Sequence, residues 1–144
     1  MGAKHKNSGA EIVMVISVGR QELADLARNA AHHAHGNAWN SPGKARFEGS
    51  ASDRLDFSVQ APGPLKRELM AFRMRVAPGQ HAGTQEVRVS IASFKTMQSK
   101  FLGLVPMGPK KLLGFAAYRS FMDGLASGVQ SKDPLAAVSV PGIV

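Results

Sequence analysis

The sequence predicts a single α+β domain in which one antiparallel β-sheet packs against a long C-terminal helix. Two segments repeat apolar residues at helical spacing, and four segments alternate apolar and polar residues as half-buried strands do. The 144 residues suffice for one hydrophobic core. The predicted order is β-α-β-β-β-β-α within residues 11–132, flanked by an N-terminal tail at 1–10 and a C-terminal tail at 133–144.

The first strand and the first helix are predicted near the N-terminus. Residues 12–16 are consecutive, apolar and mostly β-branched, which indicates a strand with both faces at least partly covered. A helix follows, because apolar residues recur there at spacings of three and four. Its apolar face consists of Leu23, Leu26, Ala27, Ala30, Ala31 and Ala34. Gly36 supplies a stop signal, and the turn-forming residues of 37–43 predict a loop.

Four strands are predicted next, each with one apolar and one polar face. They cover residues 45–48, 54–60, 70–76 and 87–91, with a hairpin at 49–53 and turns at 61–64 and 78–83. Strands of this kind form antiparallel sheets that are covered on one side only. The alternation slips between Ile91 and Phe94, which predicts a bulge or the end of the strand near Ser93.

The last element is predicted to be the long helix. Pro109 suits its first turn, and an apolar stripe at a spacing of four runs through Leu113, Ala117, Phe121, Leu125 and Val129. Gly114, Gly124 and Gly128 thin one flank of this helix, which indicates close packing on the sheet, space for a ligand, or a partner helix. Residues 95–107 fit a short helix or an extended loop equally well.

Composition excludes several classes of protein. The chain has no cysteine, so disulfides, zinc–thiolate sites and thiol nucleophiles are ruled out. The apolar run at 12–18 is too short to span a membrane and has the wrong flanks for a signal peptide, so we expect a cytoplasmic protein without a membrane partner. The formal charge of +8 comes from scattered cations, which indicates a solvated surface.

No catalytic or cofactor motif is present, so we expect a binding protein rather than an enzyme, and no cofactor. The chain lacks a Gly-x-Ser-x-Gly nucleophile elbow and a Walker-type phosphate loop. His32 and His35 are spaced to face one metal ion, but no further ligand is placed beside them. We therefore expect no metal site.

The element order resembles the helix-grip arrangement of the START-like and polyketide-cyclase-like superfamily, with TATA-binding-protein-like domains as more distant relatives. The resemblance covers about residues 11–130 and implies a small hydrophobic ligand held between the concave sheet face and the C-terminal helix. The pattern places there Phe57, Met70, Phe72, Met74, Val89, Ile91, Phe115, Tyr118, Phe121 and Met122. A methionine-rich lining adapts to irregular ligands, although the same residues can simply fill a core.

Two other functions compete with ligand binding. The first is a protein–protein interaction, such as a homodimer, through a sheet edge, the loop around Trp39 or the apolar tail at 135–144. The second is non-specific nucleic-acid binding through a basic sheet face carrying Arg46, Arg54, Arg73, Arg75 and Arg88. These arginines have no aromatic residues among them on the same face, since the phenylalanines point the other way, and this disfavours nucleic-acid binding because no base could stack there.

Overall fold

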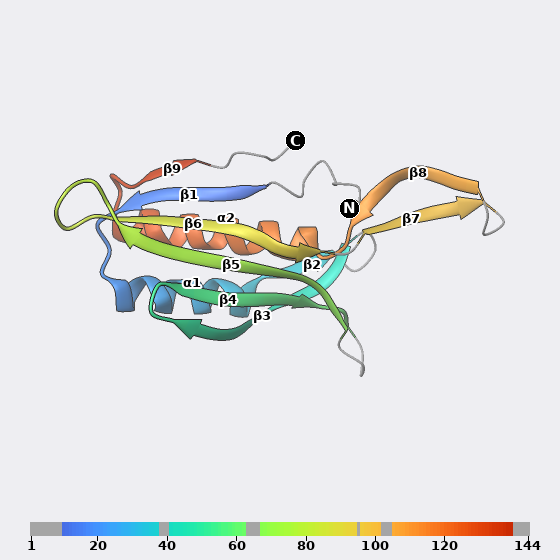
Figure 1. Ribbon diagram of the computed structural model, residues 1–144, viewed down its shortest axis with the longest axis horizontal. Coiled ribbons are helices and arrows are strands. Elements are labelled where there is room, and N and C mark those ends of the chain that lie inside the picture. The colour runs from blue at the N-terminus through green and yellow to red at the C-terminus, as the bar shows by residue number, and fades with distance from the viewer. Residues whose placement is uncertain (1–9, 38–40, 63–66, 95, 102–104, 140–144) are drawn as a thin grey trace.

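The computed structural model describes residues 10–37, 41–62, 67–94, 96–101 and 105–139, and its architecture is of the predicted α+β class (Figure 1). Seven strands form one antiparallel sheet in the order β2-β3-β4-β5-β6-β1-β9. Its strands are β1 (Glu11–Ile16), β2 (His35–Asn37), β3 (Ser41–Ala51), β4 (Arg54–Gln60), β5 (Glu68–Pro78), β6 (Gln85–Phe94) and β9 (Ala137–Ser139). The helices are α1 (Arg20–His33) and α2 (Phe115–Lys132).

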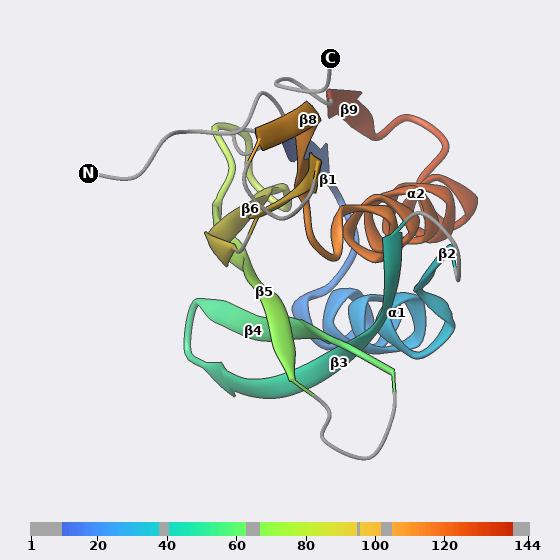
Figure 2. The same ribbon diagram turned by 90° about the vertical axis from the view of Figure 1, so that its right-hand side faces the viewer.

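The sheet curls into a half-barrel, and both helices lie on its concave side (Figure 2). Strands β7 (Thr96–Phe101) and β8 (Val105–Leu112) form a separate hairpin that projects from one end of the sheet (Figure 1). The C-terminal helix therefore packs against an antiparallel sheet, as predicted. This is the arrangement of a helix-grip-like fold.

The four predicted meander strands are confirmed by their pairing. Phe57 of β4 lies opposite Phe72 of β5, and Met74 of β5 lies opposite Val89 of β6, so the apolar alternation of each strand reaches the same concave face. Ala71 pairs with Ser93 whereas Phe72 pairs with Ile91. One additional residue therefore stands in β6 between these pairs, which confirms the irregularity predicted near Ser93.

The predicted start of the C-terminal helix is wrong. Pro109 lies in β8, Leu113 precedes the helix, and α2 begins at Phe115. Gly114 stands before it as the N-cap, with a left-handed φ of 83°. A Cβ atom at this position would lie 3.0 Å from Val59 Cγ1. Gly114 is thus a turn residue that separates β8 from α2, because only glycine adopts this conformation at low cost beside a buried strand.

The two glycines inside α2 face the other helix. A Cβ atom on Gly124 would lie 3.6 Å from the Cβ of Ala30, and one on Gly128 would lie 3.3 Å from Leu26 Cδ2, both residues of α1. Close approach of α1 therefore explains the thin flank of α2. For Gly124 and Gly128 the alternative observed is thus the partner helix, which belongs to the same chain, whereas Gly114 lies against the sheet.

The remaining differences from the predicted order concern short or weakly patterned strands. β2 follows α1 directly where a stop and a loop were predicted, and β3 continues to Ala51, so that the turn is confined to residues 52 and 53. Neither a helix nor a loop forms at 96–101 and 105–107, where β7 and β8 pair instead. β9, within the predicted tail, pairs with β1. Residues 1–9, Trp39 and residues 140–144 lie outside the described part.

Candidate functional site

The ten predicted ligand-binding residues come from β4, β5, β6 and α2. Eight of them are buried, and Ile91 and Phe115 are partly buried and pack against the same core. The structure therefore brings the predicted residues together in one hydrophobic cluster. Met70 also lines a hollow of about 110 Å³ with Glu68, Leu69, Ser93 and Phe94.

Aromatic rings occupy the middle of this cluster. Phe57 stacks on Phe72 with ring centroids 5.2 Å apart, and Phe121 of α2 lies 4.9 Å from the first ring and 4.8 Å from the second. Tyr118 lies 5.1 Å from Phe72. These separations are those of aromatic pairs in contact. The side chains of the chain itself thus take up the centre of the space between the sheet and α2.

Tyr118 ties α2 to the sheet. Its hydroxyl group donates a hydrogen bond to the carbonyl oxygen of Ala10 at 2.8 Å and lies 3.3 Å from the carbonyl oxygen of Val89. Burial, followed by the negative charge of Glu11, raises the pKa of the Tyr118 phenol far above its ordinary value. The phenol therefore stays protonated near neutral pH, where it serves as a hydrogen-bond donor and not as a proton acceptor.

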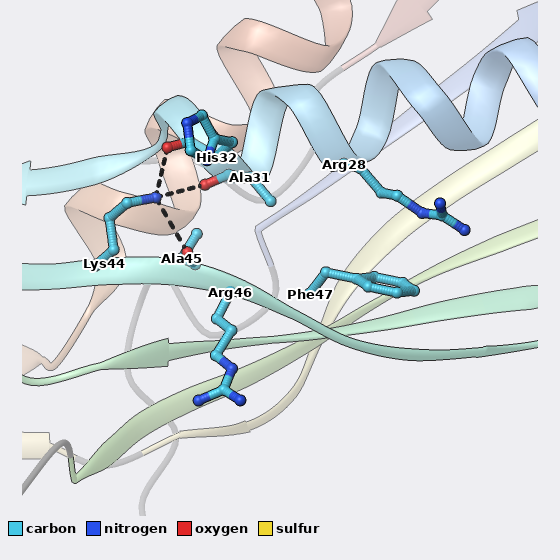
Figure 3. A pocket seen from close by; sticks show the side chains of 7 residues that line it. All are labelled: Arg28, Ala31, His32, Lys44, Ala45, Arg46 and Phe47. Carbon is cyan, nitrogen blue, oxygen red and sulfur yellow. Dashed lines mark hydrogen bonds between the residues drawn. The ribbon is translucent and has the colours of Figure 1, made fainter.

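A pocket of about 230 Å³ opens between the C-terminal part of α1 and strand β3 (Figure 3). Helix α1 forms one wall of the pocket, and Ala27, Ala30 and Ala31 of this helix are buried. Strand β3 supplies the opposite wall, with Ala45 buried and Phe47 partly buried. The pocket is lined by Arg28, Ala31, His32, Lys44, Ala45, Arg46 and Phe47.

Lys44 is hydrogen-bonded to the C-terminal end of α1. Its Nζ atom donates hydrogen bonds to the carbonyl oxygens of Ala31 at 2.9 Å, His32 at 2.6 Å and Ala45 at 3.2 Å (Figure 3). An ammonium group placed there adds a donor to the carbonyls of the last helical turn and complements the negative end of the helix dipole. Desolvation by burial lowers the pKa of Lys44. The lysine consequently acts as a cap for α1.

Arg28 is the cation left available in the pocket. Its Cζ atom lies 4.9 Å from the centroid of the Phe47 ring, within the range of a cation–π interaction. No carboxylate of the described residues forms an ion pair with Arg28. Arg46 projects from the other side of β3, away from Phe47 (Figure 3). The pocket thus has two features: an apolar wall, and a guanidinium group that has no acidic partner among the described residues.

The histidines near the end of α1 do not assemble a metal site with other described residues. The His32 and His33 rings meet edge to face at 5.1 Å, and Nδ1 of His33 lies 2.9 Å from the carbonyl oxygen of Asn29. Within the described part of the chain, no three side chains among histidine, aspartate and glutamate lie close enough to share a metal ion.

Comparisons with protein-family models, curated proteins and solved structures found no match. The helix-grip resemblance accordingly rests on the architecture alone.

Neither described helix combines the length and the apolar character that crossing a membrane requires.

Sequence reasoning did not identify the pocket between α1 and β3. Lys44 stood out only as one of several scattered cations, and Phe47 only as an inward residue of a strand. Arg28 lies outside the apolar face of α1 and carried no signal by itself. The pocket arises because β3 packs beside α1, with the amide of Ala45 donating to the carbonyl oxygen of Ala34 at 3.1 Å. Phe47 also pairs with Phe57 on the neighbouring strand, a register that only the structure shows.

Proposed function

We propose that the protein binds a small organic anion with an apolar body in the pocket between α1 and β3. The observation that carries this proposal is the position of Arg28, which lies over the face of Phe47 without a carboxylate partner among the described residues. A carboxylate or phosphate group would supply the missing partner, since guanidinium binds both with paired hydrogen bonds. Ala31, Ala45 and Phe47 would contact the apolar body of the ligand.

The size of the pocket limits the ligand. Its volume of about 230 Å³ lies below the roughly 300–1,000 Å³ of pockets that hold drug-sized molecules. A short acyl chain or a single substituted ring would fit, whereas a sterol or a polyketide would not. The proposal therefore retains an apolar ligand but makes it smaller and gives it a charge.

The pocket also borders the cluster predicted to hold a ligand. Phe47 lies 5.5 Å from Phe57, which stacks on Phe72 and touches Phe121. Phe47 is therefore an outer ring of the aromatic cluster, and the predicted binding residue Phe57 would contact it from the interior. We propose binding without catalysis, because Lys44 is engaged with α1 and no acid–base pair faces Arg28 in the lining.

Thermal unfolding in the presence of matched ligands tests this proposal. Hexanoate, benzoate and phenyl phosphate should raise the melting temperature, whereas the methyl esters of the two carboxylates should not. Replacing Arg28→Gln should weaken binding roughly 10- to 100-fold, the value of a hydrogen bond to a charged group. Arg119→Gln, an exposed arginine of α2, is the matched control and should bind as the wild type does. Equal binding of acids and esters, or unchanged binding by Arg28→Gln, would contradict the proposal.

A further inference from the structure

The convex face of the sheet carries three arginines in line. Arg54 of β4 lies directly opposite Arg75 of β5, and Arg75 lies directly opposite Arg88 of β6. We call these three residues the arginine ladder. Neighbouring strands are about 4.8 Å apart, so the ladder spans about 10 Å across the sheet. Like charges placed directly opposite one another on adjacent strands repel, so this register carries an unfavourable interaction in the isolated protein.

Acidic residues compensate the ends of the ladder but not its middle. Arg88 pairs with Glu11 at 3.3 Å, and Arg54 Nε lies 3.6 Å from Asp56 Oδ2. Asp56 is shared, because its other oxygen accepts a 2.6 Å hydrogen bond from Arg73. Arg75 is exposed and forms no ion pair with any described residue.

Arg54 is only partly satisfied by Asp56, because the 3.6 Å separation is too long for a hydrogen bond. Its Nε atom is buried and has no hydrogen-bond partner within the described residues. Buried donors without partners are rare in folded proteins, and the Arg54 side chain as a whole is 40% exposed, so its outer nitrogens are open to an external acceptor. The pairs with Asp56 and Glu11 are partly exposed, and such surface pairs open at small cost. The ladder can therefore exchange these carboxylates for another anion.

The surroundings of the ladder limit what this anion is. Both helices lie on the concave side of the sheet, so no described helix covers the ladder (Figure 2). The phenylalanines of β4 and β5 are buried on the concave face, and the described part of these strands therefore offers no aromatic ring beside the arginines for a base to stack on. Single strands are commonly held by such stacking, whereas a duplex keeps its bases stacked internally and presents phosphates outward.

We propose that the arginine ladder docks on the phosphate backbone of double-stranded nucleic acid, without sequence preference. The net charge of +8 attracts a polyanion to the whole protein, and the ladder provides a local row of guanidinium groups for its phosphates. The three guanidinium groups lie close enough together to meet neighbouring phosphates on the surface of a duplex. The absence of stacking rings, which disfavoured nucleic acid at the level of sequence, thus argues against single strands and not against duplexes.

The test is the salt dependence of binding to a short fluorescent DNA duplex, measured by anisotropy at several NaCl concentrations. The triple variant Arg54→Gln/Arg75→Gln/Arg88→Gln should reduce the slope of log K against log salt by about three, because each lost phosphate contact removes about 0.9. The control triple variant Arg20→Gln/Arg67→Gln/Arg119→Gln removes the same charge from exposed arginines elsewhere and should keep the wild-type slope. Circular dichroism confirms that both variants fold.

Three results would overturn the proposal. Equal reductions of the slope by the two triple variants would show that only net charge acts. A single strand with the same number of phosphates that binds as tightly as the duplex would point to a different surface. Absence of duplex binding at the lowest salt concentration would exclude the ladder as a docking surface. None of these results bears on the pocket between α1 and β3, which lies on the other side of the sheet.

Discussion

The two faces of the sheet differ in chemistry, and strand β5 shows this difference. Its inward residues Phe72 and Met74 are almost completely buried and contact other apolar side chains. Its outward residues Arg73 and Arg75 alternate with them and face solvent in part or fully. On the concave face Phe72 and Met74 meet apolar neighbours, whereas on the convex face Arg75 lies between two other arginines. The apolar contacts that stabilise the fold therefore lie on the concave face, whereas the convex face carries an arginine without an acidic partner among the described residues.

The largest predicted effect lies in the aromatic cluster. Phe72→Ala removes a ring that contacts Phe57, Tyr118 and Phe121, and we expect a loss of about 3–5 kcal/mol in the free energy of unfolding. Urea denaturation followed by circular dichroism measures this loss. Arg73→Ala on the same strand is the matched control and should cost less than about 1 kcal/mol, because its ion pair with Asp56 is partly exposed. Similar losses for both variants would contradict the contrast between the faces.

A smaller effect is predicted for the hydroxyl group of Tyr118. Tyr118→Phe leaves the carbonyl oxygen of Ala10 without its donor, which should cost about 1–3 kcal/mol near neutral pH. The raised pKa of Tyr118 adds a pH dependence. Above about pH 10 the unfolded tyrosine loses its proton while the folded one keeps it, so wild-type stability falls with pH by up to about 1.4 kcal/mol per unit.

The variant lacks this titration, so the difference in stability between the two proteins should shrink as the pH rises above 10. Urea denaturation of both proteins from neutral to alkaline pH measures it. A constant difference across the whole range would show that the phenol does not resist ionisation in the folded state.

The smallest predicted effect has the opposite sign. Arg75→Gln removes the central charge of the arginine ladder and should stabilise the protein by up to about 1 kcal/mol, because it relieves repulsion across two strand pairs. The gain should decline as NaCl is added, since salt screens exposed charges. Melting temperatures at low and high salt check this, with Arg119→Gln as a reference that should change little. A loss of stability at low salt would mean that Arg75 already has a favourable partner.

Local pattern was enough to predict the elements that bury one regular face. Alternation predicted β4, β5 and β6, and the slip after Ile91 predicted the irregular pairing of β6. The strands β2 and β9 have three residues each, too few to display a period of two. The start of α2 was misplaced because Leu113 continues the helical spacing, while the left-handed backbone of Gly114 interrupts the helix.

The candidate sites depend on packing and strand register, which the amino-acid sequence alone does not reveal. The predicted ligand residues do gather in one cluster, but whether any of them binds a ligand stays a prediction, as do the cytoplasmic location and the homodimer. The pocket required α1 and β3 to lie side by side, and the arginine ladder required the register of three strands. A shift of one residue in either pairing would turn Arg75 to the other face.

The position of β1 also determines the order in which the sheet can be completed during synthesis. This strand is made early, yet its two neighbours in the sheet are made much later, since Ile12 pairs with Val89 and Val13 with Ser139. Until those segments leave the ribosome, both edges of an apolar, β-branched strand stay unpaired. Such a nascent strand is open to pairing with other chains. The sheet around β1 is therefore complete only after both β6 and β9 have been translated.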